Sequence, residues 1–303
     1  MKPTGTWATL LPPIQSDDRI DFGRLREELE IIAAAGVSGV YSNGTAGEFY
    51  SQTEEEFDRI QGLMAEVCQR SGLPFQIGSS HTSAQTMLDR VRRSRQWSPS
   101  ALQVILPDWM PLSNEEAIRF LERIAEASEG IPLVLYNPPH AKRVLSPTDY
   151  AALAEAVPGL IGLKVGGGDD AWYEAMQPVF RRLSVFVPGH LLASGHARGA
   201  HGAYSNVACL SPAGAQRWYA RMQTDPAGAL EFQSRLVRFF ETHLMPLRLE
   251  RAYCNHAFDK LLAAIGGWAD VGTRLRWPYN WFPPETADRL RPIAHDELGD
   301  LWG

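Results

Sequence analysis

Short apolar runs alternate with longer amphipathic segments along most of the chain. Each run has four to six residues with few charges, a pattern typical of strands that are buried on both faces. The runs that end between Asn43 and Val187 follow one another at intervals of 23 to 35 residues, the length of one strand and one helix. The pattern predicts strands at Gly5–Leu10, Gly39–Asn43, Phe75–Gly78, Leu102–Leu106, Pro132–Tyr136, Leu160–Lys164, Leu183–Val187 and Gly202–Asn206.

The segments between these runs begin with residues that cap helices. Ser51–Glu54, Ser113–Glu116 and Ser146–Asp149 each offer a side-chain oxygen to the first free amides of a helix. Eight strand and helix units in about 220 residues predict a closed (β/α)8 barrel, a TIM barrel of the α/β class. A doubly wound sheet would usually need fewer strands and a glycine-rich phosphate turn after the first strand, which the sequence lacks.

The pattern changes from about Pro226 onwards, where helical periodicity continues without further strands. We predict a barrel domain over residues 1–225 and a helical extension over residues 226–303, packed on the barrel without a core of its own. The predicted helices of this extension are Ala227–Leu244, Ala252–Ile265 and Pro284–Leu301.

The composition is that of a folded globular protein, with 45% hydrophobic and 21% charged residues. A net charge of -6 disfavours nucleic acid as a partner. No stretch approaches the roughly 20 apolar residues that cross a bilayer, and the N-terminus lacks the apolar run of a signal peptide. Cys68, Cys209 and Cys254 are widely spaced, which suits reduced thiols. We therefore expect a soluble, cytoplasmic protein without a membrane partner.

Lys164 is the most informative candidate for chemistry, because it ends the sixth predicted strand, and barrel active sites lie at the carboxyl ends of strands. It is one of only four lysines, and arginine supplies the other 25 of the 29 basic residues. Burial on an apolar strand disfavours the ammonium and leaves a nucleophilic amine, chemistry that arginine does not provide. The alternative is a lysine that reaches solvent or pairs with Asp169 or Glu48.

Tyr136 ends the preceding strand, so its phenol should stand beside the Lys164 amine and shuttle protons. A half-buried aromatic residue without a chemical role is the alternative. Thr45 lies in a glycine-flanked turn, where its hydroxyl and the backbone amides could bind a substrate carboxylate or simply cap a helix. Glu48 would complete a capping box with Thr45, which predicts a structural role.

A metal site is not predicted. His190, His196 and His201 are six and five residues apart, which fits neither a helical pair of zinc ligands nor a short ligand motif. Solvated or packed histidines are the better interpretation, and metal-dependent catalysis is disfavoured for the same reason.

Four motifs resemble the family of dihydrodipicolinate synthase and N-acetylneuraminate lyase, class I aldolases and related lyases that use pyruvate or other 2-oxo acids. The resemblance covers nearly the whole chain, and the motifs match in order and spacing. They are Gly44–Glu48 (GTAGE), Tyr136–Pro139 (YNPP), Gly162–Lys164 (GLK) and Gly202–Ala208 (GAYSNVA).

The resemblance implies specific roles for these positions. Lys164 would form the Schiff base, Tyr136 would be the acid/base group, and Thr45 with nearby amides would anchor the carboxylate. It also implies a homotetramer of two tight dimers and no metal or organic cofactor. The residues expected to contact substrate are Gly44, Thr45, Ala46, Trp109, Tyr204 and Ser205.

Three positions depart from the family pattern. Ala46 stands where a second hydroxyl is expected to relay protons from Tyr136, so we expect the relay to be absent. Trp109 replaces a tyrosine that the neighbouring subunit usually lends, and Ala141 replaces an arginine, although Arg143 follows two residues later. We therefore predict that the protein is not the lysine-pathway synthase, and that it prefers a substrate whose distal part is aromatic, cyclic or weakly charged.

The sequence thus predicts a Schiff-base lyase, an aldolase or a dehydratase, that acts on pyruvate or a related 2-oxo acid. Both reactions use an iminium that draws electrons from the neighbouring carbon. A barrel that binds a 2-oxo acid without turnover, as a sensor or scaffold, is the alternative, and turnover of a substrate panel distinguishes the two.

Overall fold

A closed barrel of eight parallel strands forms the centre of the computed structural model, which describes residues 2–303. The strands follow one another around the barrel in chain order, and β8 pairs with β1 to close it. The predicted (β/α)8 fold is therefore confirmed. The strands are β1 (Gly5–Thr9), β2 (Gly39–Tyr41), β3 (Phe75–Gly78), β4 (Ala101–Ile105), β5 (Leu133–Asn137), β6 (Leu160–Val165), β7 (Ser184–Phe186) and β8 (Gly202–Tyr204).

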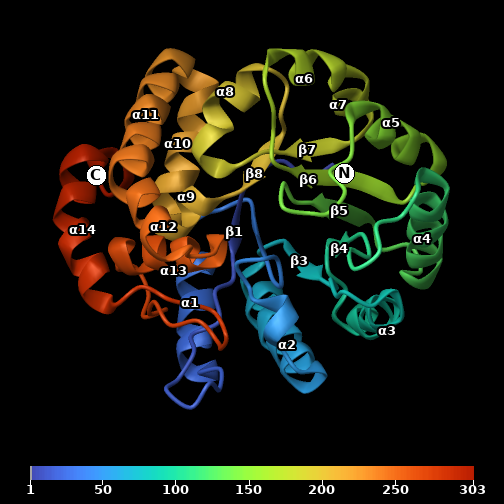
Figure 1. Cartoon of the computed structure of the whole chain (residues 1–303), viewed down its shortest axis with the longest axis horizontal. Coiled ribbons are helices and arrows are strands. Elements are labelled where there is room, and N and C mark those ends of the chain that lie inside the picture. Colours follow the sequence, from blue (N-terminus) through green and yellow to red (C-terminus); the bar gives the residue numbers. More distant parts are fainter. Residues whose placement is uncertain (1) are drawn as a thin grey trace.

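Helices surround this barrel as an outer ring (Figure 1). The α-helices of the barrel part are α1 (Phe22–Ala34), α2 (Glu54–Ser71), α3 (Ala84–Ser94), α4 (Asn114–Ala127), α5 (Pro147–Ala156), α6 (Asp170–Ala175), α7 (Gln177–Arg182), α8 (Leu192–Ala197), α9 (Asn206–Leu210) and α10 (Pro212–Thr224). Short 3-10 turns are η1 (Phe49–Ser51), η2 (Arg95–Trp97) and η3 (Gly189–Leu191).

Side-chain caps fix where several of these helices begin. Ser113 and Ser146 start α4 and α5 with capping boxes, as the sequence predicts. In α2 the cap is Thr53, which accepts from the Glu56 amide, while Ser51 ends the preceding 3-10 turn. The helix start predicted in this segment is therefore correct, but the capping residue is Thr53, two residues after Ser51.

The interior of the barrel is filled mainly by aromatic side chains. Trp7, Tyr41, Phe186 and Tyr204 pack together with Ala101 and Val134 in a cluster of buried residues. A second, larger cluster lies between the strands and the surrounding helices and continues into the C-terminal helices. Residues of the C-terminal extension therefore belong to the same core cluster as residues of the barrel.

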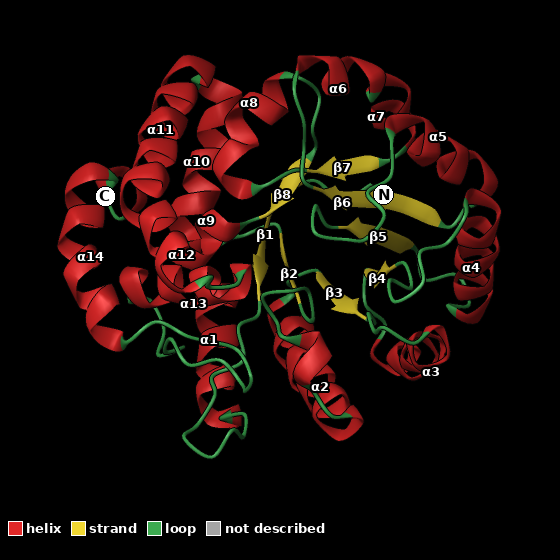
Figure 2. Ribbon diagram, in the orientation of Figure 1, coloured by secondary structure: helices red, strands yellow, loops and turns green. Residues whose placement is uncertain are grey.

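The C-terminal helices gather on one side of the barrel (Figure 2), where α13 packs against α9. The Trp268 indole donates to the Cys209 carbonyl at 2.7 Å and ties the segment after α13 to the barrel. The boundary predicted after residue 225 falls between α10 and α11, and it remains a prediction. The elements are α11 (Pro226–Phe239), the π-helical turn η4 (Phe240–Leu244), α12 (Met245–Arg251), α13 (Asn255–Gly266), α14 (Pro284–Glu297) and η5 (Gly299–Leu301).

Two details of the extension differ from the predicted helices. Helical structure continues beyond Leu244 through α12 to Arg251, and Ala252, expected to begin a helix, adopts a left-handed conformation with φ of 51°. Ala252 therefore ends α12, and the next helix, α13, begins at Asn255. Among the helices of residues 2–303, none is both long and apolar enough to span a bilayer.

Candidate active site

Lys164 and Tyr136 lie side by side at the carboxyl ends of neighbouring strands. The two residues are directly opposite each other in the register between β5 and β6. The Lys164 Nζ atom lies 4.1 Å from the centre of the Tyr136 ring. The expectation that these side chains meet at the barrel mouth is therefore confirmed.

The Lys164 amine is enclosed by aromatic rings. Its Nζ donates to the Tyr41 hydroxyl at 3.0 Å and lies 5.3 Å from the centre of the Tyr204 ring. A Cβ atom at Gly44 would stand 3.2 Å from Nζ and 2.7 Å from the Tyr41 ring, so the absence of a side chain there keeps space for the amine. Burial lowers the pKa of Lys164 to about 7, and the charge of Asp259 opposes this shift.

Neither carboxylate considered as a partner for Lys164 is paired with it. Asp169 caps α6 by accepting from the Trp172 amide at 2.9 Å. Glu48 forms an ion pair with Lys260 at 2.7 Å, and both side chains are almost fully buried. Lys164 is thus left facing the cavity with a single hydrogen-bond acceptor among the described residues, the Tyr41 hydroxyl.

Tyr136 is joined to Thr45, whose Oγ1 atom lies 3.1 Å from the phenolic oxygen. The expectation that no hydroxyl lies next to Tyr136 is therefore wrong, because Thr45 supplies one although Ala46 does not. Burial raises the pKa of Tyr136 to about 12, although the bond to Thr45 opposes the shift. The phenol is consequently a proton donor in its resting state.

The turn that carries Thr45 contains two backbone amides without an acceptor among the described residues. The amides of Gly47 and Glu48 donate to the carbonyls of Gly44 and Thr45. The amides of Thr45 and Ala46 have no acceptor within residues 2–303, so they are available to a bound anion.

The capping box predicted between Thr45 and Glu48 is wrong. Thr45 contacts Tyr136, and Glu48 accepts from the Arg276 amide at 3.0 Å besides pairing with Lys260. The structural role expected for Glu48 holds, because its carboxylate ties the turn to the C-terminal part of the chain. Arg276 and Lys260 lie more than 200 residues further along the chain, and no local pattern links them to Glu48.

A cavity of about 380 Å³ opens in front of the Lys164 amine. Its inner end is polar and is formed by the barrel, including Thr9, Thr45 and Tyr136. Its outer wall comes largely from the C-terminal helices and is mainly apolar. The residues of that wall are Phe240, Leu244, Met245, Arg248, Asn255, Phe258, Asp259 and Leu262.

The other residues predicted to contact substrate are distributed unevenly around this cavity. Ala46, Tyr204 and Ser205 line it. The Tyr204 hydroxyl donates to Gln76 Oε1 at 2.6 Å, which points it into the barrel. Trp109 does not line the cavity of its own chain and is 79% exposed. Its role in substrate binding stays a prediction.

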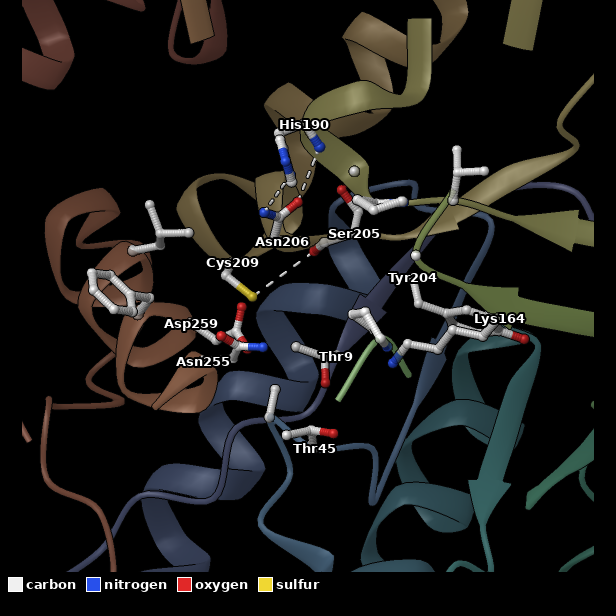
Figure 3. Close-up of a pocket in the computed structure, with 18 of the residues that line it drawn as sticks. Thr9, Thr45, Lys164, His190, Tyr204, Ser205, Asn206, Cys209, Asn255 and Asp259 are labelled. Carbon is white, nitrogen blue, oxygen red and sulfur yellow. Dashed lines mark hydrogen bonds between the residues drawn. The ribbon is translucent and has the colours of Figure 1, made fainter. Parts of the chain in front are cut away.

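Asp259 and Tyr41 are cavity residues that the sequence analysis did not single out. Figure 3 shows Asp259 and Lys164 reaching into the cavity from opposite sides, with Thr9 between them in this view. Tyr41 could have been found, because it lies within the second predicted strand, two residues before the predicted end at the catalytic rim. Asp259 lies in a helix that carries no motif, and only the packing of α13 on the barrel brings it to the site.

The structure brings together no group of three or more metal-ligating side chains in the part of the chain that it describes. His190 donates its amide to Asn206 and contacts the same side chain through its ring, whereas His196 contacts the Ala200 carbonyl and His201 accepts from the Val185 amide. The three histidines are therefore engaged in separate local contacts.

The protein is a (β/α)8 barrel. The Lys164 amine and the Tyr136 phenol face a cavity at the carboxyl ends of its strands, where the active sites of such barrels lie. A sequence model of the Dihydrodipicolinate synthetase family matches residues 2–259. The chain belongs to this family, whose members include N-acetylneuraminate lyases. The resemblance identified from the motifs is thus confirmed.

The similarity to individual relatives is modest. N-acetylneuraminate lyase of Citrobacter koseri is 27% identical over 166 residues, which are 54% of this chain and 55% of that lyase. The lyase of Salmonella typhimurium is 26% identical over the same length. The match spans about half the length of these curated relatives.

Solved structures of low sequence identity share the fold over almost the whole chain. YagE of E. coli K12, determined in complex with pyruvate, is 20% identical, with a TM-score of 0.84 over 97% of this chain and 98% of that chain. CdNal of Clostridium difficile, determined with mannosamine, is 16% identical, with a TM-score of 0.83 over 98% and 100% of the chains.

Proposed function

We propose that the protein is a Schiff-base lyase that acts on pyruvate or a related 2-oxo acid, with Lys164 as the nucleophile. The observation that carries this proposal is a half-buried lysine of lowered pKa that faces a cavity beside a tyrosine phenol. A neutral amine attacks a ketone carbonyl, and loss of water then gives an imine. The imine requires no metal or organic cofactor.

Tyr136 serves this reaction as the acid/base group. Its phenol lies next to Lys164, and its bond to Thr45 holds it in position. A phenol with a pKa of about 12 can protonate the departing hydroxyl when the carbinolamine loses water. The free amides of Thr45 and Ala46 then bind the substrate carboxylate, and the Thr45 hydroxyl is left for Tyr136.

Two related structures support this proposal. YagE was determined with pyruvate, and the sialic acid aldolase of Ruminococcus gnavus has been studied as a catalytic lysine mutant. That aldolase mutant is 16% identical to this chain, with a TM-score of 0.83 over 99% of this chain and 97% of that chain. Lys164 is the candidate for the equivalent lysine, because it lies at the cavity on β6.

A turnover assay tests the proposed activity. Purified protein is incubated with a panel of 2-oxo acids, including N-acetylneuraminate and 4-hydroxy-2-oxoglutarate, and pyruvate release is followed with lactate dehydrogenase. We expect at least one substrate to be cleaved, and we expect the Lys164→Arg variant to be inactive. Binding of pyruvate without turnover of any substrate would instead favour the sensor or scaffold.

We further propose that the protein works as a homotetramer in the cytoplasm. Trp109 and Met110 are both strongly exposed and lie beside each other, which is unusual for large apolar side chains and typical of an interface. Three free cysteines agree with a reducing compartment. Light scattering on the purified protein should give four times the mass of one chain, and a monomer would contradict the assembly.

A further inference from the structure

The Tyr41 phenol lies against the atom that has to attack the substrate. Its oxygen is 3.0 Å from the Lys164 Nζ atom and is the one acceptor of that amine within the described chain. Tyr41 is almost fully buried on β2. The proposed reaction uses Lys164 and Tyr136 and leaves the Tyr41 phenol without a role. Because the nitrogen lone pair forms the new bond, the direction of this contact matters for the chemistry.

The Tyr41 ring is held from two sides. It packs edge-on against the Tyr204 ring, with 4.7 Å between the ring centres, and the Tyr204 hydroxyl donates to Gln76 at 2.6 Å. Gly44 approaches from the turn, where even a Cβ atom would stand 2.7 Å from the Tyr41 ring. The phenol therefore meets the amine from a fixed direction.

The Thr9 hydroxyl is a second polar group beside the Tyr41 phenol. Thr9 and Tyr41 are partners in the register between β1 and β2, and both line the cavity that Lys164 faces (Figure 3). The Thr9 Oγ1 atom is buried and makes no hydrogen bond to any other described residue. Burial raises the pKa of Tyr41, and a hydrogen bond between the two hydroxyls opposes that rise. The Thr9 oxygen has lone pairs that can accept the phenolic proton.

A hydrogen bond between a neutral amine and a phenol can run in two directions. An amine N–H can donate to the phenolic oxygen, which leaves the nitrogen lone pair free. The phenolic O–H can instead donate to the nitrogen, which occupies the lone pair. Since the phenol is the stronger donor, the second arrangement prevails unless another acceptor takes the phenolic proton. Thr9 Oγ1 is such an acceptor.

We propose that Thr9 and Tyr41 are positioning residues that keep the lone pair of Lys164 free for the substrate. Thr9 accepts the proton of the Tyr41 hydroxyl, and the Tyr41 oxygen accepts an N–H of the Lys164 amine. The lone pair then points away from Tyr41 and into the cavity. This inference rests on the proposed Schiff-base function and adds two residues that prepare its nucleophile.

The arrangement prepares the first bond of the reaction. The lone pair of Nζ forms a bond with C2 of the 2-oxo acid, and the electron pair of the C2–O double bond moves to the oxygen. Tyr136 gives its proton to that oxygen and takes one from the nitrogen, so the carbinolamine is neutral and the phenol is restored. The N–H that Tyr41 accepts stays on the nitrogen, and Thr9 and Tyr41 keep their own protons.

Reductive trapping with pyruvate and excess borohydride measures the reactivity of the amine. The initial rate is taken on the alkaline plateau, above the pKa of about 7 for Lys164, so that the amine is neutral. The variants are Thr9→Val, Tyr41→Phe and the double variant with both changes. Thr9→Ser keeps the hydroxyl. Thr6→Val is the matched control, because Thr6 is a buried threonine of the same strand that does not line the cavity.

In Thr9→Val the phenol turns its proton to the amine, so we expect the trapping rate to fall by about fivefold to tenfold, the effect of one hydrogen bond. Tyr41→Phe removes that competing donor. The double variant should therefore be faster than Thr9→Val and should match Tyr41→Phe within about twofold. Thr9→Ser and Thr6→Val should react at the wild-type rate.

A merely structural role predicts the opposite order, because two changes in one packed layer then add their losses. A double variant as slow as Thr9→Val or slower overturns the inference alone. A Thr9→Val variant as fast as the wild type, or a Thr9→Ser variant as slow as Thr9→Val, does the same. A wild type that pyruvate and borohydride do not modify overturns the proposed function itself.

Discussion

Two lysines at the barrel, Lys164 and Lys260, show how the contacts of a lysine decide its chemistry. Lys260 is enclosed by Glu48 and two backbone carbonyls, so its ammonium is fully satisfied. Lys164 donates only to the Tyr41 hydroxyl and faces a cavity. Desolvation lowers the pKa of both lysines, but only Lys164 has room for an electrophile.

The lowered pKa of Lys164 predicts the pH dependence of imine formation. Only the neutral amine is nucleophilic, so the rate of imine formation should rise as the pH increases through about 7 and level off above it. The measurement is the initial rate of borohydride trapping with pyruvate across a pH series. A midpoint near 10.5, the ordinary value for lysine, would contradict the assigned environment of Lys164.

Replacement of Tyr136 by phenylalanine should slow turnover by about 10²–10⁴-fold, the usual contribution of a positioned acid/base group. Some imine should still form, because the Lys164 amine is untouched. Thr45→Val removes only the partner of the phenol, so we expect a smaller loss. Steady-state rates of the three proteins provide the measurement, and a Thr45→Val variant slower than Tyr136→Phe would show that the roles are reversed.

At the scale of elements, the turn at residues 44–48 and helix α13 form one unit. Glu48 has a left-handed backbone, with φ of 52°, and reaches Lys260 on α13 at 2.7 Å. The turn bears Thr45, and the helix bears Asp259 next to Lys260. One buried ion pair therefore sets the relative position of two walls of the cavity.

Removal of the positive partner of this pair should destabilise the protein strongly. Lys260→Met leaves the Glu48 carboxylate buried without its counter-charge, which costs about 3–5 kcal/mol of unfolding free energy. Urea unfolding measures the change, with the exposed Lys2→Met variant as a control. The double variant Glu48→Gln, Lys260→Met should recover part of the loss, and a single variant as stable as the wild type would refute the role of the pair.

The repeating elements of the barrel were predictable because their pattern is local. Apolar runs and capping residues placed all eight strands, and the strand register made Lys164 and Tyr136 neighbours, as expected. The partners of Thr45 and Glu48 were not predictable in the same way. Both side chains bind groups that are distant in sequence, Tyr136 for Thr45 and Lys260 with Arg276 for Glu48.

At the scale of the whole molecule, the C-terminal helices complete the site that the barrel begins. The barrel supplies the polar inner end of the cavity, and η4, α12 and α13 supply most of its outer wall. No motif marks this contribution, so Asp259 escaped the sequence analysis. The wall combines apolar residues such as Phe240, Leu244 and Phe258 with the charged Arg248 and Asp259, and the expected weakly charged distal part of the substrate stays a prediction.

We expect the protein to be a poor catalyst for condensing pyruvate with aspartate semialdehyde. Ala141 offers no charge where the family resemblance places an arginine, and the nearby Arg143 is bound to the Leu112 carbonyl and to Asn114. Because the Thr45 hydroxyl lies 3.1 Å from the Tyr136 phenol, this prediction depends chiefly on the missing arginine. A steady-state kcat/KM of about 10⁴ M⁻¹s⁻¹ or higher would contradict it.

The central claim is that Lys164 forms a covalent imine with a 2-oxo acid, and reductive trapping tests it most directly. The protein is incubated with pyruvate and borohydride, digested and mapped by mass spectrometry. We predict one modified lysine, Lys164, and no labelling of a folded Lys164→Arg variant. Modification of Lys142 or Lys260, or labelling that persists in the variant, would contradict the account.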